Sequence, residues 1–165
     1  MMKYPNNTVT SMFDSPLGPI RLAASPQGLS GVWFEGQDDS VHASRWTFDT
    51  NHALLQQAAR QLTEYFAGQR RAFDLPLDLS TGTAFQQAVW RALLDVPFGQ
   101  TCSYGKVSTT IGKPTAVRAV GSAIGRNPLS IVVPCHRVIG ANGALTGYSG
   151  GMDRKVALLT IEGSL

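Results

Sequence analysis

The chain has 165 residues, enough for one domain or two small ones with a buried core. Its composition is globular, with 43% hydrophobic and 15% charged residues and a formal net charge of +3. No apolar run approaches the ~20 residues of a membrane-spanning helix. The first residues also lack the apolar core of a secretion signal, so we expect a cytoplasmic protein.

The charge is distributed unevenly along the chain. Residues 1–82 contain six Lys/Arg and eight Asp/Glu, whereas residues 83–165 contain eight and three. The first part therefore carries −2 and the second +5. A basic second half indicates a polyanionic partner for that part of the chain.

The cysteine and histidine spacings exclude two classes of site. Two cysteines, Cys102 and Cys135, do not make a disulfide framework, and no CxxC or HxxxH spacing occurs. A metal held by the neighbours Cys135 and His136 is disfavoured, because adjacent side chains of an extended chain point to opposite faces. We expect no metal and no cofactor.

The first half reads as strands followed by a helix. Three short β-rich runs separated by turn sequences predict an antiparallel meander, at residues 8–14, 19–24 and 29–35. A charged, structureless stretch is expected from there to Asn51. Apolar residues then recur at helical spacing until Gly68 stops the helix. An extended connector follows, and we place the domain boundary between residues 79 and 80.

The second half reads as helices with one short strand. The predicted order is a helix capped by Thr83, a short helix at 104–111 capped by Ser103, a second short helix at 115–125, a strand at 131–133 and a last helix at 152–162. The two short helices, separated by a glycine-containing break, form a helix-turn-helix pattern. The predicted strand would lead directly to Cys135.

The second helix of this pattern has unusually small side chains. Residues 115–125 read TAVRAVGSAIG, in which Arg118 is the one long polar residue. Readers of the major groove normally use several Arg, Asn, Gln or Lys side chains. A slim helix instead suits the minor groove and a sequence-tolerant mode of DNA binding. Close packing between two helices is the alternative explanation.

Cys135 is the candidate nucleophile. Only the thiolate is a good nucleophile, and the adjacent His136 could raise the thiolate fraction. The alternative is that Cys135 simply ends a core strand, since cysteine is often buried. An enzyme that acts on a base must extrude it from the stack, and Arg118 could fill the space left behind. The cysteine, the slim helix and the lone arginine together favour base-repair chemistry.

An ordered set of motifs closely resembles the O6-alkylguanine-DNA alkyltransferases, also called methylated-DNA–protein-cysteine methyltransferases. The motifs are YG at 104–105, RAVG at 118–121, NP at 127–128, PCHRVIG at 134–140 and GYSGG at 147–151. The likeness is dense from about Phe85 to Gly163 and lies mainly in layout before that. It is closest to bacterial members without the adaptive-response regulator domain.

The resemblance implies a mixed α/β (α+β) fold with two domains. Residues 1–79 would form a ribonuclease-H-like domain with an antiparallel β-sheet and a helix. Residues 80–165 would form a mostly helical catalytic domain with a winged-helix-like helix-turn-helix.

The resemblance also implies the catalytic residues. Cys135 would take a methyl or alkyl group from O6-alkylguanine in DNA, with O4-alkylthymine as a further candidate substrate. His136 would act on Cys135 through a water, and Glu162 would orient His136. Tyr104 would donate a hydrogen bond or proton to the departing guanine. The protein would stay alkylated, so each molecule would react once.

The resemblance also implies which residues bind DNA and which form the substrate pocket. Arg118 would replace the flipped base, although a phosphate contact is the alternative. Other DNA contacts would come from Ser103, Thr115, Ala116, Ala119, Gly121 and Ser122. The substrate pocket would be formed by Asn127, Arg137, Val138, Tyr148 and Ser149.

The expected partner is double-stranded DNA that contains alkylated guanine, bound through the minor groove largely independently of sequence. We expect a monomer with no membrane partner, and cooperative assembly on DNA is an open alternative. Two other functions compete with repair: a non-catalytic alkylated-DNA binding protein, disfavoured by Cys135, and a helix-turn-helix regulator, disfavoured by the residue-poor second helix.

Overall fold

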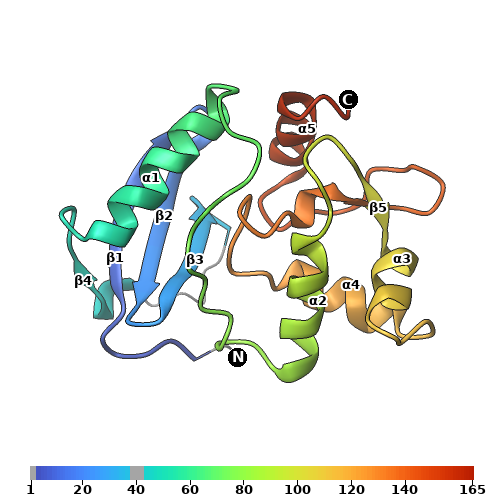
Figure 1. Cartoon of the computed structure of the whole chain (residues 1–165), viewed down its shortest axis with the longest axis horizontal. Helices are drawn as coiled ribbons and strands as arrows, with labels where there is room; N and C mark the ends of the chain where they lie inside the picture. The colour runs from blue at the N-terminus through green and yellow to red at the C-terminus, as the bar shows by residue number, and fades with distance from the viewer. Residues whose placement is uncertain (1–2, 38–42) are drawn as a thin grey trace. The chain divides into compact units, whose positions relative to one another are not determined.

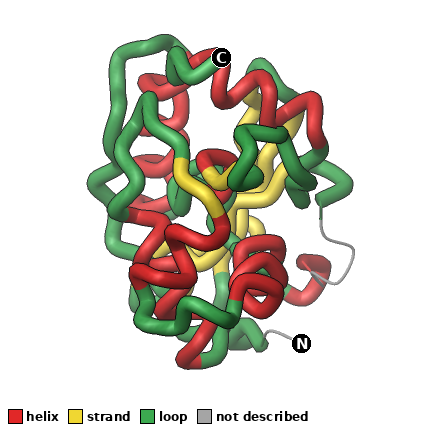
Figure 2. Tube along the Cα trace, turned by 90° about the vertical axis from the view of Figure 1, so that its right-hand side faces the viewer, coloured by secondary structure: helices red, strands yellow, loops and turns green. Residues whose placement is uncertain are grey.

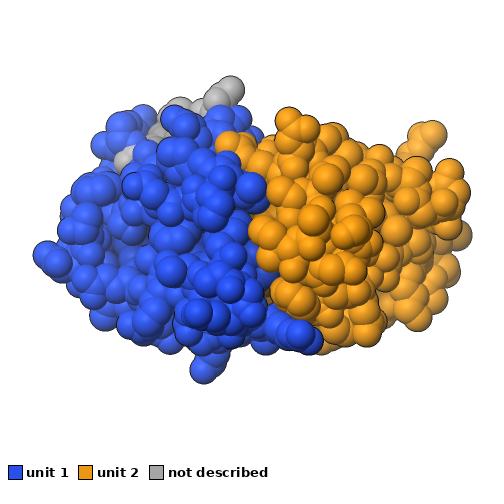
Figure 3. Space-filling model, turned by 90° about the horizontal axis from the view of Figure 1, so that it is seen from above, with its two compact units in different colours: residues 1–81 blue, residues 82–165 orange. Residues whose placement is uncertain are grey.

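The computed structural model describes residues 3–37 and 43–165 of the chain (Figure 1). The chain divides into two compact units, residues 1–81 and residues 82–165 (Figure 3). The first combines a sheet with a helix, and helices and loops predominate over strand in the second (Figure 2). The mixed α/β fold class expected from the sequence is confirmed.

The first unit is built on a four-stranded sheet in the order β3-β2-β1-β4. Its strands are β1 (Val9–Ser15), β2 (Gly18–Ser25), β3 (Gly28–Phe34) and β4 (Thr47–Phe48). The first three form the predicted antiparallel meander, joined by two-residue turns.

Strand β4 and the short 3-10 helix η1 (Ala43–Arg45) correct the expectation of a structureless stretch. Strand β4 pairs in parallel with β1, and the Asp49 amide continues this contact by donating to the Thr10 carbonyl at 2.9 Å. The pairing satisfies backbone groups at the edge of β1, which local sequence patterns do not register. Residues 38–42 of the same stretch lie outside the described part of the chain.

Helix α1 (Ala53–Phe66) lies against the meander strands (Figure 1). Its buried residues include Leu55, Ala58, Leu62 and Tyr65, at the helical spacing that the sequence predicted. The helix ends before Gly68, whose φ of 75° is readily available to glycine.

The second unit begins with helix α2 (Ala84–Leu94), which starts at a capping box. The Thr83 hydroxyl accepts from the Gln86 amide, and the Gln86 side chain accepts from the Thr83 amide. The buried Trp90 donates through its indole nitrogen to the Ala123 carbonyl at 2.8 Å. This bond ties α2 to the helix that we predicted to bind DNA.

The predicted helix-turn-helix consists of α3 (Tyr104–Thr110) and α4 (Val117–Gly125), which pack against each other. Ser103 caps α3 as expected, by accepting from the Lys106 amide at 3.1 Å. Two short strands, β5 (Cys102–Ser103) and β6 (Val138–Ile139), pair in parallel just before α3 and just after the cysteine motif. Helix α5 (Met152–Ile161) ends the unit.

The strand predicted at residues 131–133 is wrong. These residues form a turn, in which the Val132 amide donates to Ser130 and the Val133 amide donates to Leu129. Ile131 has a φ of 71°, an uncommon conformation for a β-branched residue. The run is apolar because the turn is buried, and a short buried turn therefore has the same apolar sequence pattern as a core strand.

Candidate functional site

Cys135 lies in a single 3-10 turn, η2 (Cys135–Arg137), rather than at the end of a strand. The Arg137 amide closes the turn by donating to the Pro134 carbonyl at 3.0 Å. All three residues of η2 are buried, and Cys135 is 4% exposed. Successive side chains of such a turn are about 120° apart, so the opposite-face geometry expected of an extended chain does not apply.

The Asn127 side chain braces the turn that precedes Cys135. Its Nδ2 donates to the Val133 carbonyl at 2.8 Å, and its Oδ1 accepts from the Leu129 amide at 2.9 Å. Both groups are buried and satisfied, which holds the strained Ile131 in place. Asn127 therefore links the end of α4 to the cysteine turn.

His136 and Glu162 form a buried pair. His136 Nε2 lies 2.8 Å from Glu162 Oε2, and both side chains are inaccessible to solvent. Burial lowers the pKa of His136, and the hydrogen bond and charge of Glu162 only partly oppose this effect. The neutral ring therefore donates from Nε2, which leaves Nδ1 with a free lone pair. His136 Nδ1 has no hydrogen-bond partner among the described residues.

Arg137 binds the same carboxylate. Its Nε donates to Glu162 Oε1 at 2.8 Å and its Nη2 to Glu162 Oε2 at 3.0 Å. Its Nη1 donates to the Val96 carbonyl at 2.7 Å. We expected Arg137 among the substrate-binding residues, but these bonds commit its guanidinium to Glu162 and to the end of α2.

The Cys135 thiol is protonated in the resting site. Burial raises its pKa, against smaller opposing contributions from Asn127, the charge of Lys155, its own backbone and Tyr148. A buried thiol of this kind needs a base before it can act as a nucleophile. His136 is the neighbouring group with an available lone pair.

Lys155 is a buried residue whose place in the site the sequence did not predict. It is 0% exposed, and its Nζ donates to the Val138 carbonyl at 2.7 Å and to the Thr146 carbonyl at 3.1 Å. Burial lowers its pKa, and a negative charge on Cys135 would oppose this effect. One signal was available: Lys155 shares a helical face with Leu158, Leu159 and Glu162, all of them buried.

Tyr104 is held at both ends of its side chain. Its ring lies over Gly121, where an added Cβ would be 3.7 Å from the ring. Its hydroxyl is 2.6 Å from the Thr146 hydroxyl. The Tyr148 ring packs edge-on to His136, with 6.5 Å between the ring centroids.

The predicted DNA-contact residues are all at least partly accessible to solvent. Arg118, Ala119, Ser122 and Thr115 are exposed, and Ser103, Ala116 and Gly121 are partly exposed. The opposite face of α4 buries Val120, Ala123 and Ile124. Close packing therefore accounts for only part of the slim composition. Of the remaining predicted pocket residues, Val138 is buried and Ser149 is exposed.

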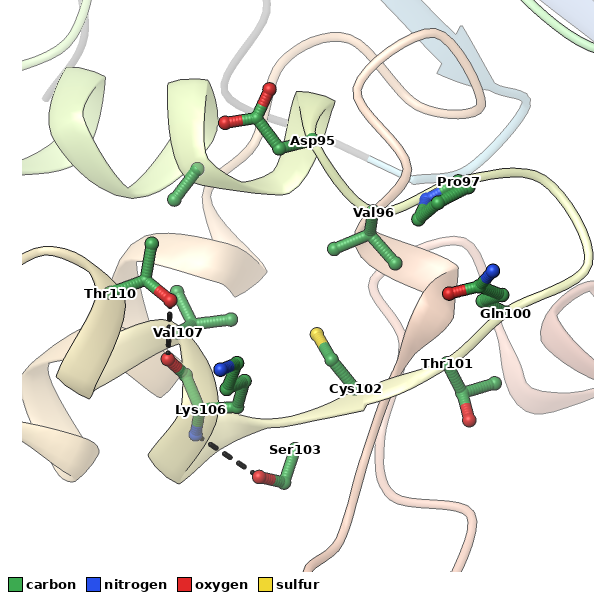
Figure 4. Close-up of a pocket in the computed structure, with 11 residues that line it drawn as sticks. Asp95, Val96, Pro97, Gln100, Thr101, Cys102, Ser103, Lys106, Val107 and Thr110 are labelled. Carbon is green, nitrogen blue, oxygen red and sulfur yellow. Dashed lines mark hydrogen bonds between the residues drawn. The ribbon is translucent and has the colours of Figure 1, made fainter.

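A pocket of about 380 Å³ lies beside α3, and its walls exclude the predicted catalytic residues (Figure 4). It is lined by Ala92, Asp95, Val96, Pro97, Gln100, Thr101, Cys102, Ser103, Lys106, Val107 and Thr110. Burial raises the pKa of the Cys102 thiol, which the nearby charge of Lys106 partly offsets. Unlike Cys135, Cys102 has no histidine next to it in the sequence.

Residues 3–37 and 43–165 contain neither a candidate metal site nor a candidate membrane-spanning helix. No three His, Cys, Asp or Glu side chains in these ranges are grouped so that they could hold a metal ion. None of the helices described there is long and apolar enough to cross a membrane.

Comparison with known proteins places the chain in a family. The profile of the 6-O-methylguanine DNA methyltransferase DNA-binding domain matches residues 84–164, and that of the ribonuclease-like domain matches residues 8–79. The methylated-DNA–protein-cysteine methyltransferase of Methanosarcina acetivorans is 48% identical over 155 residues, covering 93% of this chain and 97% of the relative. That of Mycobacterium bovis is 50% identical over 151 residues, covering 92% and 90%.

Solved structures agree with this placement. Mycobacterium tuberculosis OGT in complex with DNA matches with a TM-score of 0.87 and 49% identity, covering 94% of this chain and 93% of that one. The O6-methylguanine-DNA methyltransferase of Pyrococcus kodakaraensis matches with a TM-score of 0.60 and 26% identity, covering 94% and 99%.

The chain belongs to the 6-O-methylguanine DNA methyltransferase family, whose relatives at about half identity are methylated-DNA–protein-cysteine methyltransferases. It is an enzyme of that class. The family resemblance and the ribonuclease-like first domain expected from the sequence are confirmed.

The first prediction concerns the buried carboxylate. Replacing Glu162→Gln leaves the Arg137 guanidinium buried without its counter-charge, so we expect the free energy of unfolding to fall by about 3 kcal/mol. Glu64→Gln is the matched control, because Glu64 pairs with Arg70 at 3.3 Å on the surface and its loss should cost under about 1 kcal/mol. Urea denaturation of the full chain measures both, and equal losses would contradict the assignment.

The second prediction concerns pH. The pKa of His136 is lowered by folding from 6.5, so below that pH the unfolded chain takes up a proton that the native site resists. The free energy of unfolding should therefore fall as the pH drops below 6.5, by at most about 1.4 kcal/mol per pH unit from this group. His136→Gln, which cannot titrate, should show a shallower fall in matched urea titrations. Parallel curves for the two proteins would refute this origin.

Proposed function

We propose that this protein repairs O6-alkylguanine in DNA by a single, irreversible transfer of the alkyl group to Cys135. The observation that carries the proposal is the buried cysteine turn backed by the His136–Glu162 pair, in a chain of the methyltransferase family. O4-alkylthymine is a further candidate substrate.

The transfer itself is a displacement at the alkyl carbon. The bond from Cys135 sulfur to the alkyl carbon forms as the bond from that carbon to O6 breaks, and the electron pair passes to the guanine. The thiol proton moves through a water to His136 Nδ1, and the resulting imidazolium is stabilised by Glu162. The guanine gains one proton in turn and leaves as the normal base. No step regenerates the thiol, so each protein molecule reacts once.

Tyr104 assists departure of the base. Its hydroxyl donates a hydrogen bond or a proton to the purine ring as negative charge develops there, which stabilises the transition state. Asn127 shapes the pocket by bracing the cysteine turn, while Val138, Tyr148 and Ser149 line the base site. Arg137 acts as a positioning residue, because its guanidinium holds the Glu162 carboxylate through two hydrogen bonds.

The exposed side of α4 provides the DNA-binding surface. Its small side chains allow close approach to the minor groove, and Arg118 enters the stack in place of the flipped base. Ser103, Thr115, Ala116, Ala119, Gly121 and Ser122 contact the backbone or groove walls. Binding is independent of sequence, because such a surface offers few groups that distinguish bases. The structure of a relative in complex with DNA supports the proposal that this chain binds DNA.

We assign different roles to the two domains. DNA binding and transfer reside in residues 80–165, and residues 1–79 support that domain structurally. We place the enzyme in the cytoplasm as a monomer, where it acts on cellular DNA without a cofactor.

The third prediction tests the acceptor residue. After incubation with duplex DNA containing O6-methylguanine and no S-adenosylmethionine or metal, the intact protein should carry one methyl group, mapped by peptide mass spectrometry to Cys135. Cys135→Ser should gain none. Cys102→Ser is the matched control and should be methylated like the wild type, because Cys102 lines a pocket whose walls exclude the predicted catalytic residues.

A folded wild-type protein that binds the lesion but gains no methyl group would overturn the proposal in favour of a non-catalytic alkylated-DNA binding protein. Binding that ignores the lesion would instead favour a helix-turn-helix regulator. Methylation mapped to Cys102 would show that the wrong thiol had been assigned.

A further inference from the structure

The loop between β6 and α5 carries a hydroxyl that contacts the predicted proton donor. Thr146 is partly exposed, and its Oγ1 lies 2.6 Å from the Tyr104 hydroxyl. Forty-two residues separate the two in sequence, so only the fold brings them together. Sequence motifs give Thr146 no role, because it stands just before the GYSGG motif.

We propose that Thr146 is a positioning residue for Tyr104: its hydroxyl donates to the phenol oxygen and so directs the phenol proton toward the departing base. The inference rests on the transfer proposed above. A tyrosine hydroxyl has one proton to donate, and this proton must go to the base. The hydrogen bond between the two hydroxyls must then be supplied by Thr146, whose own proton can rotate freely.

Thr146 is fixed well enough to perform this task. Its carbonyl accepts from the buried Lys155 Nζ at 3.1 Å, and the same ammonium binds the Val138 carbonyl in β6. The loop is also closed on itself, since the Gly140 amide donates to the Ala144 carbonyl at 2.9 Å. The hydroxyl of Thr146 is therefore carried on backbone that is tied to the cysteine motif.

The phenol has two fixed points as a result. The ring of Tyr104 packs beside Gly121 on α4, while Thr146 engages the hydroxyl. When the Thr146 proton points at the phenol oxygen, the phenol proton is left to point away from Thr146. A chain of two hydroxyls also polarises the terminal O–H, which makes it a stronger donor to the base.

The fourth prediction tests this role with substitutions that leave the backbone contact to Lys155 in place. Thr146→Val keeps the shape and removes the hydroxyl, and we expect the single-turnover methyl-transfer rate constant to fall by about 3- to 10-fold, as for loss of one neutral hydrogen bond. Thr146→Ser keeps the hydroxyl and should restore the rate to within about 2-fold of wild type. Thr160→Val is the matched control, because the Thr160 hydroxyl donates to the Val156 carbonyl of its own helix at 2.7 Å.

A double-mutant cycle separates positioning from packing. In a Tyr104→Phe background, where no phenol remains to be oriented, adding Thr146→Val should change the rate constant by less than about 2-fold. An equal loss in both backgrounds, a wild-type rate for Thr146→Val, or failure of Thr146→Ser to restore the rate would each overturn the inference. Absence of transfer by the wild type is a different outcome, which would refute the proposed function instead.

Discussion

The buried carboxylate of Glu162 is the interaction on which the site depends. It accepts from His136 through Oε2 and from Arg137 through both oxygens, in a region closed to solvent. A buried carboxylate without such partners would be too costly to keep ionised. The arginine supplies the counter-charge, so the histidine can remain neutral while its ring orientation is fixed.

This carboxylate also joins elements that are distant in the chain. Glu162 follows α5, its partners lie in the turn η2, and Arg137 extends the network to the Val96 carbonyl beyond α2. Lys155, on the same face of α5, binds the backbone of β6 and of the following loop. One helix face thus positions the cysteine turn, its histidine and the loop that reaches Tyr104.

The chemistry follows from that arrangement. Burial keeps the pKa of the Cys135 thiol high and the pKa of His136 low, so the resting site holds a neutral thiol and a neutral base. A neutral pair costs less free energy to bury than two separated ions.

Local patterns were sufficient to predict much of this protein. Turn sequences and apolar spacing predicted the meander and the helices, and the capping residues Thr83 and Ser103 marked two helix starts correctly. The turn at 131–133 was mistaken for a strand because burial gave it a strand-like composition. Strand β4 was missed because its stability comes from pairing with β1.

The functional site, like the fold, could be predicted from local sequence motifs but not where it depends on long-range contacts. The motif around Cys135 indicated a nucleophile with a histidine, and family resemblance pointed to Glu162 and Tyr104. Arg137 binds Glu162, and Thr146 contacts Tyr104, although the two residues of each pair are far apart in sequence. The side chain of Lys155 is buried only because of the way the chain folds. No sequence pattern records such contacts.

The site depends on Glu162 holding His136 as a neutral base with its lone pair on Nδ1. Nitrogen-15 NMR of protein labelled at histidine measures this directly, with the His136 signals assigned by their loss in His136→Gln. We expect a protonated Nε2 and an unprotonated Nδ1 at neutral pH. A proton on Nδ1 with Nε2 bare, or an imidazolium at neutral pH in the resting protein, would contradict it.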